Sequence, residues 1–264
     1  KLYNKGLEKR APDFSKDAEK LREILIDVIA SRHPSLPSDI KESQYLHCCR
    51  YLSNFETFYT LNYDLLLYWA FMHSDGKDKM KIDDGFRMPD DGPSDYVSWN
   101  VENTKSQRVF YLHGALHLFD AGAEIQKYTW INTGIPLLRQ IRKAMDDGMF
   151  PLFVAEGKSE EKKTRINHSG YLNRGYRSFA SIKGNLFVYG HSFAENDAHI
   201  LKLIEQGRIT SLFVSIYGDP ESKGNKRIIK RAEAMEIYRK SANESNQLKV
   251  FYYDADSANI WGNK

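Results

Sequence analysis

At 264 residues the chain is long enough to bury about three quarters of its unfolded surface, and no linker-like stretch divides it, so we predict one domain over residues 1–264. Its 38 Lys and Arg against 35 Asp and Glu leave a formal charge of +3, far below the concentrated positive charge of a dedicated nucleic-acid binder. The two cysteines, Cys48 and Cys49, are adjacent, which excludes a disulfide framework and a four-cysteine zinc site and suits a reducing cytoplasm. No run approaches the roughly 18 apolar residues of a membrane span, so we expect a cytoplasmic protein without membrane contact.

The first half of the chain mixes helical and extended patterns. Apolar residues at helical spacing after Ser15 predict a first helix that ends before Pro34. Residues 74–107 are dominated by Gly, Asp, Pro and Lys, and we interpret them as a loop excursion. The other predicted elements are helix 38–53, strand 55–61, helix 65–73, strand 108–112 and a hairpin within 115–130.

The second half alternates strands with helices. The patterns predict helix 135–147, strand 151–155, helix 160–182 with a break near Gly170, strand 185–189, helix 196–206, strand 211–217, helix 224–241 and strand 248–253. This rhythm indicates βαβ crossovers, and we therefore predict an α/β fold with a mostly parallel sheet.

Polar residues follow the first predicted strand, and in open α/β sheets ligands bind at the carboxyl ends of strands. Asn62 and Asp64 stand there, between a strand and a helix, where their side chains could face a ligand. The alternative is local: Asp64 caps the helix and Asn62 forms the turn, because both residue types favour such positions.

His113 follows the second buried strand, and the adjoining Gly114 permits close approach of a backbone or a ligand. With an unperturbed pKa of about 6.5, a histidine at this position suits acceptance of a proton from a ribose hydroxyl or a water. The alternative is a core histidine bonded to a carbonyl. His117 shares no helical face with His113, and we predict no bound metal.

Gly190, Ser192 and Asp197 lie around the start of a predicted helix, whose free N–H groups and positive dipole end attract phosphate. Ser192 could donate to a phosphate or ribose, and Asp197 could hold a ribose hydroxyl. Ordinary capping by Asn196 or Asp197 is the alternative, which explains Asp197 well and Gly190 poorly.

Familiar nucleotide-binding and hydrolase signatures are absent from the sequence, including G-x-G-x-x-G, G-x-x-x-x-G-K-[ST], H-E-x-x-H and G-x-S-x-G. The helix from Lys226 to Lys240 is basic enough to contact nucleic acid. Glu233 and Glu236 interrupt its positive charge, which favours a solvated helix face.

Taken together, the motifs resemble those of the sirtuin-like superfamily: Thr60-Leu61-Asn62-Tyr63-Asp64, Leu112-His113-Gly114 and Tyr189-Gly190-His191-Ser192. The stretch from Phe55 to Tyr217 is similar to bacterial sirtuin-like domain proteins, which include NAD-degrading effectors of anti-phage defence. The resemblance implies a Rossmann-like three-layer sandwich. It also implies that Asn62 positions water or the nicotinamide ribose and that His113 accepts a ribose proton. The residues then expected to bind the cofactor are Asp64, Gly114, Gly190, Ser192 and Asp197.

The sequence departs from that family in two respects. Its protein deacylases carry a zinc module held by four cysteines, which Cys48 and Cys49 cannot supply, so a typical deacetylase is not expected. The family also begins with a Gly-rich strand-loop that cradles the pyrophosphate, and nothing before Asp13 resembles it. We expect that loop upstream of Lys1; without it the chain cannot bind NAD in the usual way.

The resulting expectation is an NAD glycohydrolase of bacterial anti-phage defence, in which NAD is the substrate and no metal takes part. Family behaviour implies a homo-oligomer or a partner protein that gates the activity. One alternative is a catalytically silent nucleotide-binding or scaffolding module that partners a separate effector. A nucleic-acid-associated subunit is the third possibility, and nucleic acid is not the expected partner.

Overall fold

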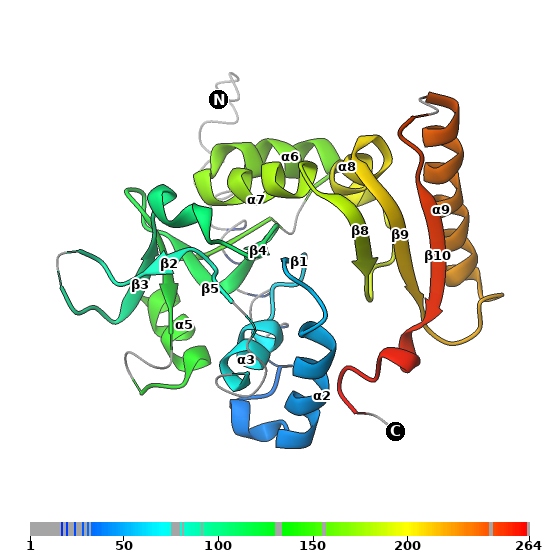
Figure 1. The fold of residues 1–264 in the computed structure, drawn as a ribbon. Coiled ribbons are helices and arrows are strands. Elements are labelled where there is room, and N and C mark those ends of the chain that lie inside the picture. Colours follow the sequence, from blue (N-terminus) through cyan, green and yellow to red (C-terminus); the bar gives the residue numbers. More distant parts are fainter. Residues whose placement is uncertain are drawn as a thin grey trace.

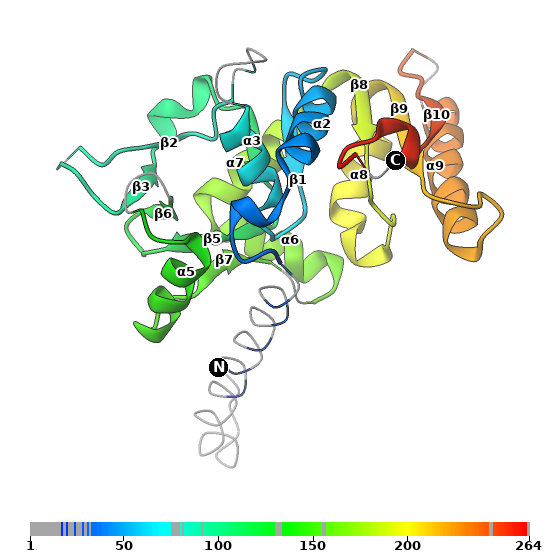
Figure 2. The ribbon, with the colours of Figure 1, turned by 90° about the horizontal axis from the view of Figure 1, so that it is seen from below.

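The computed structural model describes residues 33–74, 80, 82–90, 92–129, 134–154, 157–242 and 245–262, together with positions 17, 20, 24, 28 and 31. The helix expected after Ser15 lies outside the described residues apart from isolated positions. Figure 2 shows an antiparallel sheet on one side of the molecule and a parallel sheet on the other, with β1 between them. The fold is α/β.

The parallel strands form two separate sheets. In the first, β1 pairs with β4, with Thr60 opposite Tyr111. In the second, the strand order is β10-β9-β8, and the connecting helices α8 and α9 make both crossovers. The bounds are β1 (Phe58–Thr60), β4 (Val109–Tyr111), β8 (Lys183–Val188), β9 (Arg208–Ile216) and β10 (Lys249–Asp254).

The largest sheet of the described residues is antiparallel, with the order β2-β3-β6-β5-β7, and the expectation of one mostly parallel sheet needs correction here. The tight turn between β5 and β6 is closed by a hydrogen bond from the Ala121 N–H to the Glu124 carbonyl (3.0 Å), and such a turn can join only antiparallel strands. Part of the predicted loop excursion supplies two further strands. The bounds are β2 (Phe86–Arg87), β3 (Tyr96–Trp99), β5 (Gly114–Asp120), β6 (Ile125–Tyr128) and β7 (Pro151–Phe153).

Helices lie on both sides of the sheet formed by β1 and β4. In Figure 1, α6 and α7 lie on one side of β1 and β4, and α2 and α3 lie on the other. The predicted break near Gly170 is present, because Ser169 ends α6 and its hydroxyl accepts a hydrogen bond from the Leu172 N–H (3.4 Å) in α7. The helices are α2 (Glu42–Leu52), α3 (Leu66–His73), α5 (Leu137–Asp146), α6 (Ser159–His168), α7 (Gly170–Ala180), α8 (Ala198–Gln206) and α9 (Lys223–Ala242). Short 3₁₀ turns are η1 (Pro37–Asp39), η2 (Val101–Lys105), η3 (Glu195–Asp197) and η4 (Ala255–Ala258).

Strand β4 separates two hydrophobic cores. Side chains alternate along a strand, so Val109 and Tyr111 enter the core that β5, α3 and α5 share, whereas Phe110 and Leu112 enter the core of α8, β9 and α9. His113, the next residue, therefore lies where the two cores meet. Among the described residues, no helix is long and apolar enough to cross a membrane.

Candidate functional site

The carboxyl ends of β1 and β4 lie side by side. Since Thr60 is paired with Tyr111 in a parallel register, Asn62 and His113 each stand two residues beyond that pair. The Leu112 N–H donates to the Thr60 carbonyl (2.9 Å), which holds the two strand ends together. The side chain of Asn62 is exposed.

Asp64 stands at the start of α3. Its Oδ1 accepts a hydrogen bond from the Leu66 N–H at 2.9 Å, and it thereby acts as a local cap for the helix. This is the capping role that the sequence analysis gave as the alternative to ligand binding.

His113 is buried, with 2% of its surface exposed, and its Nε2 lies 3.0 Å from Nε2 of His199 in α8. Its backbone carbonyl accepts a hydrogen bond from the Val154 N–H (2.8 Å), just after β7. Gly114 has φ of +79°, and a Cβ there would lie 1.8 Å from the carbonyl oxygen of Leu152. Gly114 is thus required for close approach of two backbones, β5 and β7.

His199 is fixed by Ser159 at the start of α6. The Ser159 Oγ accepts a hydrogen bond from the His199 backbone N–H (2.6 Å) and lies 3.2 Å from its Nδ1. This contact orients the imidazole, so that the opposite nitrogen, Nε2, faces His113. One of the two facing nitrogens carries a proton and donates a hydrogen bond to the other.

Asp197 carries the negative charge next to the histidine pair. Lys162 Nζ donates to its Oδ1 at 3.0 Å, and His191 Nε2 lies 3.3 Å from its Oδ2. The Phe193 N–H donates to His191 Nδ1 (3.0 Å), which places the His191 proton on Nε2, facing the carboxylate. We call this group the His113 cluster, comprising His113, Ser159, Lys162, His191, Asp197 and His199.

Burial controls the ionisation of the cluster. Loss of hydration lowers the pKa of His113 to about 3 and that of His199 to about 4, because the charged imidazolium is poorly solvated there. Burial opposes ionisation of Asp197, but hydrogen bonds from His191 and Lys162 outweigh it and hold its pKa below the usual range. Both histidines are therefore neutral at neutral pH, and Asp197 is an anion.

Gly190 and Ser192 lie on the segment that leads from β8 to Asp197. Gly190 has φ of +70°, with open space where a Cβ would stand, and its N–H donates to Ser215 Oγ (3.0 Å). Ser192 is exposed, and the buried Phe193 that follows has a positive φ of 53°. This strained turn places the His191 ring beside the Asp197 carboxylate.

Three of the cluster's ligand atoms could hold a metal ion. The candidate ligand atoms of His113, Asp197 and His199 all lie within 4.8 Å of one another. The Lys162 ammonium already forms an ion pair with Asp197, and it neutralises the carboxylate in the way that a bound metal ion would. His117 lies elsewhere, fully buried between the rings of Tyr68 and Tyr111, and Cys48 and Cys49 are buried thiols that are not joined in a disulfide.

The structure thus brings His113 and Asp197 together and places Asn62 on the adjoining strand end. Sequence reasoning missed Ser159, Lys162 and His199. Two of these carried a weak signal, because Ser159 and Lys162 share the buried face of α6 with Ile166 at helical spacing. A lysine on that apolar face marks a buried ion pair.

Comparison with curated proteins and with solved structures gave no match. A family model described as a domain of unknown function, DUF4917, matches residues 2–261. Because that match spans nearly the whole sequence, the chain belongs to the DUF4917 family.

Proposed function

We propose that the protein is a cytoplasmic bacterial NAD glycohydrolase, which cleaves NAD to ADP-ribose and nicotinamide at the ends of β1 and β4. The observation that carries the proposal is the register of these strands, which aligns Asn62 with His113 beside the half-buried Asp197. Carboxyl strand ends are where α/β sheets bind ligands. The resemblance to sirtuin-like proteins supplies the identity of the substrate.

In the proposed reaction, the exposed amide of Asn62 orients the attacking water, and neutral His113 accepts a proton. The protonated imidazole is stabilised by Asp197, which raises the pKa of His113 against the larger effect of burial. His199, 3.0 Å away, offers a second proton acceptor in line. Departure of neutral nicotinamide through an oxocarbenium-like transition state leaves the protein mainly to orient the groups and exclude bulk water.

Within this proposal, the two parallel sheets are halves of one Rossmann-like sheet. Strands β1 and β8 each have an edge that pairs with no other described strand. Ring contacts of Phe55 with Phe187 (5.2 Å) and of Tyr51 with Tyr189 (6.0 Å) connect the two halves.

The proposal also includes how the activity is restrained in the cell. An enzyme that destroys NAD needs restraint, and we propose that assembly into a homo-oligomer or a partner protein gates it in anti-phage defence. Ser192 and Gly190, which line the turn before Asp197, are the proposed contacts for the phosphates and ribose. Nucleic acid is not required by any part of this scheme.

One observation favours the silent nucleotide-binding module as a second candidate. A histidine with a pKa of about 3 and 2% exposure is a weak base and is difficult for solvent to reach. If this state persists when nucleotide binds, His113 supports the fold alone.

The test is nicotinamide release from NAD by the wild type and by His113→Ala and Asn62→Ala. Loss of a positioned proton acceptor reduces the rate by about a hundredfold to ten-thousandfold. His168→Ala and Asn185→Ala change exposed residues of the same types and serve as controls. Undiminished release by a folded His113→Ala variant removes His113 from the reaction, and NAD binding without release in the wild type supports the silent module.

A further inference from the structure

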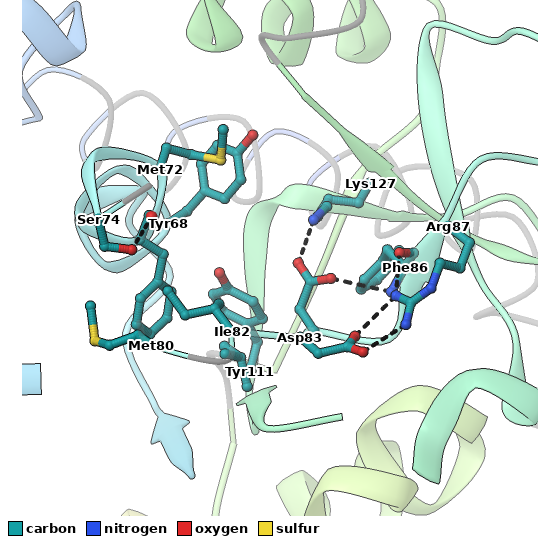
Figure 3. Close-up of a pocket in the computed structure, with 13 residues that line it drawn as sticks. Tyr68, Met72, Ser74, Met80, Ile82, Asp83, Phe86, Arg87, Tyr111 and Lys127 are labelled. Atoms are coloured by element: carbon teal, nitrogen blue, oxygen red, sulfur yellow. Dashed lines mark hydrogen bonds and ion pairs between the residues drawn. The ribbon is translucent and has the colours of Figure 1, made fainter. Parts of the chain in front are cut away.

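A cavity of about 540 Å³ lies apart from the His113 cluster, between α3 and the antiparallel sheet. Its size is within the range of about 300 to 1,000 Å³ typical of sites for small molecules. Figure 3 shows residues of α3, including Tyr68 and Met72, on one side and the charged residues Asp83, Arg87 and Lys127 on the other. None of the six residues of the cluster lines this cavity.

The wall of the cavity contains a buried cation. Lys127 is 6% exposed, forms an ion pair with Asp84, and holds its ammonium 5.4 Å from the ring of Tyr68 and 5.1 Å from that of Phe86. Burial of a lysine is costly, and an apolar side chain of similar volume packs at lower cost. Besides its bond to Asp84, the Lys127 ammonium has further N–H groups that can donate to a polar group inside the cavity.

The second ion pair keeps the lining electrically balanced. Asp83 accepts hydrogen bonds from Arg87 (2.6 Å) and from the hydroxyl of Ser106 (2.6 Å), which also hold its pKa below the usual value against the opposing effect of burial. The two carboxylates and two cations of the lining have no net charge. An ionic ligand would lose its hydration without gaining an unpaired partner of opposite sign.

A buried polar group, the Tyr111 hydroxyl, lies at the same wall. The hydroxyl of Tyr111, whose residue is 2% exposed, stays protonated, because burial and then Asp84 raise its pKa well above the usual value. His117, whose ring nitrogens lack a hydrogen-bond partner among the described residues, lies against Tyr111 and Tyr68 and does not line the cavity. The Tyr111 hydroxyl is therefore the buried neutral donor that this wall offers to a ligand.

From these observations we propose that the cavity binds a flat, uncharged aromatic amide. The rings of Tyr68, Phe71, Phe86 and Tyr111 provide flat apolar walls, and Met72 and Met80 adapt to the outline of a ring. The amide oxygen accepts from Lys127 or Tyr111, and the amide N–H groups donate to the carboxylates. Nicotinamide, the product of the proposed reaction, belongs to this chemical class, but the argument for the cavity does not depend on that reaction.

The test is methyl NMR of the protein labelled at methionine, with benzamide, benzoate and benzamidine as probes of one shape and three charges. Benzamide is expected to shift the methyl signals of Met72 and Met80 and leave that of Met235, in the other core, unchanged. Benzoate and benzamidine bind at least about tenfold more weakly. Equal binding of the three probes, or no shift at up to about 10 mM benzamide, overturns the proposal.

Two variants assign the polar contacts. Tyr111→Phe keeps the ring and weakens benzamide binding about three- to tenfold, the effect of one neutral hydrogen bond. The pair Lys127→Met and Asp84→Asn removes both charges together and avoids a lone buried carboxylate. It is expected to weaken benzamide binding about tenfold and to leave benzoate the weaker ligand, because Asp83 and Arg87 still balance the lining. Lys202→Met, at an exposed lysine of α8, is the control. Unchanged affinity in both cavity variants, with an unchanged Met235 signal as evidence of folding, overturns the proposal.

Discussion

Acidification is predicted to destabilise the protein through its buried histidines. The pKa of His113 is lowered to about 3 and that of His199 to about 4, and burial and then Lys127 lower the pKa of His117 well below its usual value. An unfolded chain binds these protons with a pKa of about 6.5. Between the folded and unfolded pKa values, the unfolded state holds more protons, so the free energy of unfolding falls as the pH falls below about 6.5.

The magnitude follows from the size of that window. At about pH 5 an unfolded imidazole is about 1.5 pH units below its pKa, and at about 1.4 kcal/mol per unit each buried histidine contributes about 2 kcal/mol of lost stability. Three such residues lose about 6 kcal/mol, a large part of the total of about 5 to 15 kcal/mol that holds a typical domain folded. Asp197, whose pKa is depressed, adds no loss above about pH 5, since its stabilising effect disappears only below the ordinary carboxyl pKa.

Urea unfolding at about pH 7.5 and about pH 5 measures this loss. In His199→Gln, which cannot titrate, the loss between the two pH values is expected to be about one third smaller. His168→Gln, at an exposed histidine of α6, is expected to behave as the wild type. Equal stability of the wild type at both pH values would refute the description of these histidines as buried and neutral.

Two further substitutions test the packing around the site. Lys162→Met leaves the Asp197 carboxylate without its buried cation and is expected to lower the free energy of unfolding by about 3 kcal/mol. Lys163→Met, at the exposed neighbour, is expected to lower it by less than about 0.5 kcal/mol. Equal urea midpoints of the two variants would contradict the ion pair of Lys162 with Asp197. In Gly114→Ala, the new methyl group would clash with the backbone of β7, and the substitution is expected to cost at least about 3 kcal/mol of stability. Gly122→Ala has open space at a similar φ of +83° and is expected to cost about 1 kcal/mol. Thermal unfolding compares the two variants, and a mild effect at Gly114 would show that β5 and β7 can separate.

Local patterns in the sequence predicted the elements of the second half well. The alternation from β8 to β10 was visible because each strand contains a run of apolar, β-branched or aromatic residues, and the helices between the strands have polar faces. The antiparallel sheet was not predicted beyond its hairpin. Strands β2 and β3 are short, half-polar and lie in a stretch rich in turn formers, and their pairing with β6 depends on contacts between distant parts of the chain.

The candidate site was predictable only where a residue follows a strand or stands at the start of a helix, as Asp197 does. Asn62 and His113 stand out because each polar residue comes after an apolar run, and the parallel register then aligns them. His199 lies within a helix that also carries Ile200, Leu201 and Ile204, and its sequence context gives no sign that it faces His113. Tertiary packing of α6 against α8 creates that contact, and a local pattern does not encode it.

The most direct measurement of the central claim is the release of nicotinamide and ADP-ribose from NAD by the purified protein, compared with its His113→Ala variant. The account predicts equal amounts of the two products from the wild type and a rate about a hundredfold or more lower in a variant that remains folded. Release at the same rate from both proteins, or no release from the wild type while NAD still binds, would contradict it.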